Sequence, residues 1–155
     1  MKILIAEDEN QKLAHIRGFV DEVFVGAEVF VAKSVRAAID VLEVHNPEVL
    51  MLDMSLPTFD IGSSEPGGRP QGFGGIEVLR YVDFLGLHVD TFVITAYEGF
   101  EEGAKAVDLT ELELKLQIEH PANFKGIVYY SGLGGDWSRT LEDLVRQAGL
   151  IGDGA

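Results

Sequence analysis

The chain has 155 residues, no cysteine and a formal net charge of −14 at pH 7. Its length suits one domain with a sizeable hydrophobic core. The lack of cysteine excludes disulfides and thiolate metal sites, and the negative charge argues against direct nucleic-acid binding, because Lys and Arg must neutralise the phosphates. No apolar run approaches the length of a membrane span, and the amino terminus lacks the pattern of a secretory signal, so we expect a cytoplasmic protein.

Apolar residues predict strands and helices in alternation. The predicted strands cover residues 2–6, 28–32, 49–52, 91–95 and 126–130. Helical spacing follows from Leu13 to Val23, after Ser34 as an N-cap, at about 75–85, at about 99–107, and from Leu141 to Ala148. Such alternation predicts a single α/β domain over residues 1–155, with a flavodoxin-like, doubly wound, five-stranded parallel sheet and helices on both faces.

Two segments depart from this regular alternation. Residues 58–75 are rich in Gly, Pro and Ser, which predicts a long mobile loop. Residues 108–124 form a predicted insertion. Within the insertion, apolar residues of 110–119 alternate at the period of a strand although the residue types favour a helix, so its structure stays open.

Three carboxylates lie at predicted strand ends. Glu7 and Asp8 directly follow the first strand, and Asp53 directly follows the third. These two strands are neighbours in a doubly wound sheet, so we expect the three side chains to converge. Crowded carboxylates repel unless a cation compensates, and Mg²⁺ prefers carboxylate, carbonyl and water oxygens. Beside such an ion, Asp53 could act as a nucleophile that accepts a phosphoryl group. The alternative is that each acid is merely solvated or caps a helix.

Four ordered motifs resemble the receiver domains of bacterial two-component response regulators. They are ILIAEDE at the first strand, LMLDMSLP around Asp53, FGGIEVLR at 73–80 and VITAY at 93–97. The resemblance implies a signalling module rather than an enzyme, phosphorylated on Asp53 by a histidine kinase or phosphotransfer protein and acting on a downstream effector. It further implies that Asp8, Asp53 and the Ser55 carbonyl bind Mg²⁺, that Glu7 assists through water, and that the Thr95 hydroxyl acts as the switch residue.

One family feature is missing. The fifth strand of receiver domains normally ends in a lysine that pairs with the phosphoryl oxygens, whereas this chain reads GIVYYSG, with Tyr130 near that position. A phenol can donate one hydrogen bond but carries no positive charge. Lys125 lies at the end of the strand away from the site, and nothing supports Lys105 as a substitute for the missing lysine. Arg69 in the long loop is an alternative donor.

Other hypotheses about the function of the chain therefore stay open. The main alternative is a pseudo-receiver that keeps the fold but binds partners independently of phosphorylation. A phosphatase of the haloacid dehalogenase type would need an acid two positions after Asp53, where Ser55 stands. A flavin carrier would place the flavin phosphate against Glu7 and Asp8, which would repel it.

Overall fold

The computed structural model describes residues 1–59, 74–96, 99–102, 105–132 and 136–152. The predicted loop at 58–75 therefore lies mostly outside the described residues, and so does Arg69. None of the helices within the described ranges has the length and apolar composition that crossing a bilayer requires.

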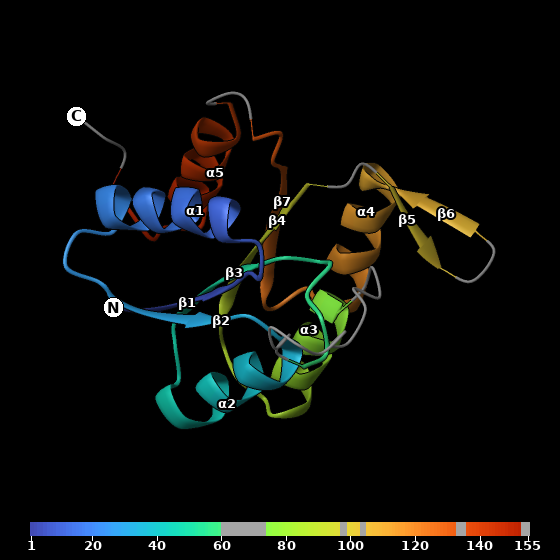
Figure 1. Ribbon diagram of the computed structural model, residues 1–155, viewed down its shortest axis with the longest axis horizontal. Coiled ribbons are helices and arrows are strands. Elements are labelled where there is room, and N and C mark those ends of the chain that lie inside the picture. Colours follow the sequence, from blue (N-terminus) through green and yellow to red (C-terminus); the bar gives the residue numbers. More distant parts are fainter. Residues whose placement is uncertain (60–73, 97–98, 103–104, 133–135, 153–155) are drawn as a thin grey trace.

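A parallel five-stranded sheet forms the centre of the fold, in the order β2-β1-β3-β4-β7 (Figure 1). The strands are β1 (Lys2–Ala6), β2 (Glu28–Ala32), β3 (Val49–Leu52), β4 (Asp90–Thr95) and β7 (Phe124–Tyr129). All four residues of β3 are buried, as expected for a central strand that is covered on both faces. The order and the parallel pairing confirm the predicted flavodoxin-like fold.

Helices cover both faces of this sheet. On one face lie α1 (Asn10–Val23) and α5 (Asp136–Gln147), and on the other lie α2 (Val35–His45), α3 (Gly74–Phe84) and α4 (Leu109–Glu119) (Figure 1). Each layer of helices packs on its own cluster of buried side chains, because successive residues of a strand point to opposite faces. The result is a three-layer domain.

The predicted helix at 99–107 is wrong. These residues instead contain two strands, β5 (Gly99–Glu102) and β6 (Lys105–Asp108), which pair in antiparallel fashion. Glycines at positions 99 and 103 explain the failure, because a glycine inside a helix costs about 1 kcal/mol relative to alanine.

The open segment at 110–119 is helical and forms most of α4. Of its four alternating apolar residues, Leu112 and Leu116 are buried, whereas Leu114 is 54% exposed and Ile118 is 78% exposed. The two buried leucines are four residues apart, which is the spacing of one helix face. The residues expected as an insertion thus supply the helix that connects β4 to β7, and the hairpin of β5 and β6 precedes it.

The site is positioned by the register of the central strands. Ala6 of β1 lies opposite Leu52 of β3, and the Asp53 N–H donates a hydrogen bond of 3.0 Å to the Ala6 carbonyl. The residues that follow these strands are consequently held side by side at the carboxyl edge of the sheet, where ligands bind in open α/β folds.

Candidate functional site

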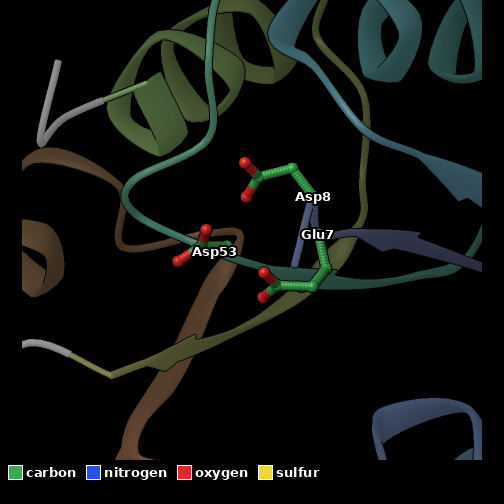
Figure 2. Close-up of side chains that lie close together, drawn as sticks. All are labelled: Glu7, Asp8 and Asp53. Atoms are coloured by element: carbon green, nitrogen blue, oxygen red, sulfur yellow. The ribbon is translucent and has the colours of Figure 1, made fainter. Parts of the chain in front are cut away.

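Glu7, Asp8 and Asp53 converge as the sequence predicted. One carboxylate oxygen from each lies within 4.8 Å of the others, and their side chains surround a common space (Figure 2). Glu7 is 1% exposed and Asp53 is 5% exposed, so two of the three carboxylates are withdrawn from water. Burying carboxylates this closely is unfavourable unless positive charge or protonation offsets it.

The environment resists ionisation of the two acids that follow β1. Burial, followed by the negative charge of Asp53, raises the pKa of Glu7 from 4.5 to about 7, although the ammonium of Lys12 opposes this shift. The same two causes raise the pKa of Asp8, which is less buried. The cluster therefore has a deficit of positive charge and favours a bound cation.

Lys12 extends from the first turn of α1 into this cluster. Its Nζ lies 2.7 Å from Glu7 Oε1 in an ion pair and 3.2 Å from Asp53 Oδ1, to which it donates a hydrogen bond. The Glu9 carboxylate caps α1 and accepts a hydrogen bond of 2.7 Å from the Lys12 N–H, which fixes where the side chain starts. Lys12 is not among the site residues that were predicted from the sequence.

A sequence signal for Lys12 did exist. Lys12, Ile16, Phe19 and Val20 share the buried face of α1, and a lysine occupies a position where this spacing calls for an apolar residue. Lysine is almost never fully buried unless it is paired. Since two acids follow the strand directly before this helix, a paired buried lysine could have been inferred.

Ser55 contacts Asp53 directly, whereas Thr95 lies at the end of β4 and contacts the residue that follows β7. The Ser55 N–H donates a hydrogen bond of 3.2 Å to Asp53 Oδ1, and its buried Oγ has no hydrogen-bond partner within the described part of the chain. Thr95 is fully buried at the end of β4, and its carbonyl accepts a hydrogen bond of 2.7 Å from the Tyr130 N–H. Asp53 thus has an available polar neighbour in Ser55, and β4 and the end of β7 are joined directly beside it.

A cavity of about 220 Å³ opens over the acids, lined by Glu7, Asp8, Glu9, Lys12, Asp53, Ser55, Ala96 and Tyr130. It is large enough for several water molecules or a small anion beside a metal ion. A larger hollow of about 500 Å³ lies between α1 and α5, but the acidic cluster does not line it. The smaller cavity is therefore the candidate functional site.

Tyr130 follows β7 directly, where the family resemblance leads one to expect a lysine. Its side chain is buried, its hydroxyl contacts His15 Nδ1, and its ring centroid lies 5.9 Å from Lys12 Nζ. Lys125 is 3.9 Å from Asp90 at the opposite end of these strands and cannot serve the site. The structure thus confirms that the end of β7 supplies no cation.

The donor set fits a hard divalent cation. Three carboxylates and the hydroxyl and carbonyl oxygens of Ser55 are the ligand types that such ions prefer. Lys12 neutralises the side of the cluster formed by Glu7 and one oxygen of Asp53, which leaves the Asp8 side with uncompensated charge. The acidic cluster could accordingly hold a metal ion between Asp8 and Asp53.

Comparison with known proteins identifies the family. No protein-family model matches the chain. The Detocs response regulatory protein DtcB of Vibrio alginolyticus is 34% identical over 122 residues, which cover 76% of this chain and 80% of that protein. The chain is a response regulator receiver domain.

Two further similarities agree with this assignment. Sporulation initiation phosphotransferase F of Bacillus subtilis is 29% identical over 98 residues, covering 62% of the receiver domain and 64% of that protein. A response regulator receiver domain protein from Clostridium thermocellum has a similar fold, with a TM-score of 0.65 at 16% identity over 95% of this chain and 92% of that one. The receiver domain is therefore a module of two-component signalling rather than an enzyme, and its acidic cluster is consistent with a phosphorylation site.

Proposed function

We propose that Asp53 accepts a phosphoryl group from a cytoplasmic histidine kinase or phosphotransfer protein, and that this modification controls binding to a downstream effector protein. The observation that carries the proposal is the convergence of Glu7, Asp8 and Asp53 at an open cavity on the carboxyl edge of the sheet. The Bacillus subtilis relative is named as a phosphotransferase, which gives the proposal additional support.

In this reaction an Asp53 carboxylate oxygen attacks phosphorus, and the new O–P bond forms as the N–P bond of a phosphohistidine breaks. The imidazole leaves with the bonding electron pair. Catalysis of such transfers consists mainly of positioning and of neutralising charge on the phosphoryl oxygens. Mg²⁺ would supply positive charge here, held by Asp8, Asp53 and the Ser55 carbonyl, with Glu7 assisting through water.

The residues of the chain itself contribute orientation. The Ser55 N–H holds Asp53 Oδ1, which fixes the rotation of the carboxylate. The Ser55 hydroxyl has no hydrogen-bond partner among the described residues and is a further donor at the cavity. Thr95, at the end of β4, is the proposed switch residue. Because its carbonyl binds the Tyr130 N–H, a movement at the end of β4 would also move the end of β7.

The experiment is chemical phosphorylation of the full chain with acetyl phosphate and Mg²⁺, read by intact mass and peptide mapping. We expect one phosphoryl group on Asp53, no labelling of Asp53→Asn, and reduced labelling of Asp8→Asn. The matched control is Asp40→Asn, because Asp40 is an exposed acid and this variant should be labelled to the same extent as wild type. Wild-type protein that stays unlabelled would contradict the proposal.

A second function is favoured by one observation, the tyrosine at the end of β7. If Tyr130 uncouples phosphorylation from any conformational change, the domain acts as a pseudo-receiver that binds its partner in either state. The effector would then bind Asp53→Asn and phosphorylated wild-type protein with equal affinity, whereas the main proposal expects different affinities.

A further inference from the structure

We infer that Lys12 of α1 supplies the cation that pairs with a phosphoryl group on Asp53, in place of a lysine at the end of the last strand. This inference rests on the proposed phosphorylation of Asp53. It assigns the role to a different element of the fold, α1, whose Lys12 forms ion pairs with Glu7 and Asp53.

The geometry places Lys12 within reach. Its Nζ is 3.2 Å from Asp53 Oδ1, and its side chain lines the same cavity as Asp53 and Ser55. Its side chain is only 4% exposed, so little water screens its charge. Within the described residues, no other lysine or arginine forms an ion pair with Asp53.

The position of Tyr130 agrees with this arrangement. Its ring lies beside the Lys12 ammonium, and its hydroxyl contacts His15 on α1. The aromatic ring thus fills the space at the end of β7 next to the ammonium, and it offers a weakly attractive face to the cation. Tyr130 therefore packs beside Lys12 and leaves the positive charge of the site to it.

Lys12 offsets part of the charge of the buried Glu7 and Asp53 carboxylates, but a whole buried ion-pair cluster is not the most stable way to fill this part of the core. Burying an ammonium costs several kcal/mol before its ion pairs offset the loss of water, and buried ion pairs can often be replaced by apolar residues without loss of stability. Lys12 lies on the same helix face as Ile16, Phe19 and Val20, where an apolar side chain would pack against the core. Besides pairing with these acids, the ammonium lines the cavity that a phosphoryl group on Asp53 would occupy.

Phosphorylation of Asp53 replaces the single negative charge of its carboxylate with a phosphoryl group of about −1.5 to −2 charges, whose oxygens lie further out in the cavity. The ammonium sits on a flexible four-carbon stem with three donors, so it can exchange its contact with Glu7 for a phosphoryl oxygen. Lys12 thus acts by charge and hydrogen bonding.

The test uses the full chain with beryllofluoride and Mg²⁺ as the phosphoryl mimic. Trp137 is the only tryptophan and its ring centroid lies 5.4 Å from that of Tyr130, so its fluorescence reports binding in the cavity. The variant is Lys12→Met, with Lys33→Met as the matched control because Lys33 is exposed and donates a hydrogen bond to Asn10.

We expect Lys12→Met to weaken beryllofluoride binding about ten- to a hundredfold, the effect of losing a hydrogen bond to a charged group. The same variant should bind Mg²⁺ alone more tightly than wild type, because a positive charge beside the cation site has been removed. Lys33→Met should change neither affinity. Adding Tyr130→Lys to Lys12→Met should recover the beryllofluoride affinity that Lys12→Met loses.

Unchanged beryllofluoride affinity in Lys12→Met would overturn the inference. Parallel weakening of beryllofluoride and Mg²⁺ binding would also overturn it, because this pattern indicates a structural role only. If Lys12→Met does not fold, Lys12→Gln is judged by the same two affinities. Wild-type protein that neither binds beryllofluoride nor accepts a phosphoryl group would instead refute the proposed function, which keeps the two failures distinct.

Discussion

Replacing Glu7 with glutamine should make the metal-free protein more stable at neutral and alkaline pH. Glu7 is almost completely buried, and its pKa is raised from 4.5 to about 7 by burial and by the charge of Asp53. The folded state therefore binds a proton that the unfolded chain has already released in this range. The contribution of Glu7 to the free energy of unfolding is fully present below about pH 4.5 and is lost as the pH rises through about 7.

The size of the effect follows from the shift. At about 1.4 kcal/mol per pH unit of pKa difference, the ionised Glu7 side chain lowers the free energy of unfolding by about 3 kcal/mol at pH 8. Glutamine has nearly the same shape and does not titrate. Glu7→Gln should consequently match wild type below about pH 4.5 and exceed its stability by up to about 3 kcal/mol at pH 8.

The assay is urea unfolding at a series of pH values, at constant ionic strength and with a chelator present. Glu22→Gln is the matched control, because Glu22 is an exposed acid on α1 and its replacement should leave the pH profile unchanged. Adding Mg²⁺ should reduce the advantage of Glu7→Gln at pH 8, since a cation stabilises the ionised carboxylate. Parallel pH profiles for wild type and Glu7→Gln would refute the reasoning.

Three further predictions concern the metal site, the packing beside it and the amino ends of β4 and β7. Asp8→Asn and Asp53→Asn should each weaken Mg²⁺ binding about tenfold or more in calorimetric titrations, and unchanged affinities would show that the pocket is misassigned. Gly75→Ala should lower the free energy of unfolding by about 1–3 kcal/mol, because its Cβ would lie 2.8 Å from the Asp53 carbonyl oxygen. Gly18→Ala is the control, since nothing lies within 4 Å of its Cβ, and equal effects of the two substitutions would contradict the packing argument. Asn123→Ala should lower the free energy of unfolding by about 1–3 kcal/mol in thermal or urea unfolding. The buried Asn123 side chain accepts a hydrogen bond from the backbone N–H of the residue before β4 and donates one to a carboxylate of α3. An unchanged free energy of unfolding would show that water replaces both bonds.

The order and type of most elements could be predicted from the sequence, because short apolar runs and helical spacing are local patterns. The N-cap of α2 is an example, since the Ser34 hydroxyl accepts a hydrogen bond of 3.1 Å from the Ala37 N–H. The helix predicted at 99–107 was wrong because the glycines at 99 and 103 disfavour a helix, and these residues instead pair as the strands β5 and β6. For 110–119, contact with the sheet decided which leucines are buried.

The missing cation shows the same division at the site. From the sequence, the tyrosine at the end of the last strand raises doubt about phosphorylation, because neither Lys125, Lys105 nor Arg69 is a supported substitute for the lysine. In the fold, the buried face of α1 brings Lys12 to within hydrogen-bonding distance of Asp53, 41 positions away in the chain. The motif identifies the acids, whereas the signal for their counter-ion is a lysine on the apolar face of the next helix, outside the motif.

The sequence by itself determined that three acids stand at the ends of two strands, and the parallel α/β pattern determined that those ends meet. Both follow from local periodicity and from the register of neighbouring strands. Only the tertiary structure decided how the acids are neutralised, because burial raises the pKa of Glu7 and helix packing directs Lys12 inward. Charge balance in a buried site depends on distances between segments far apart in the chain, and no local pattern records those distances.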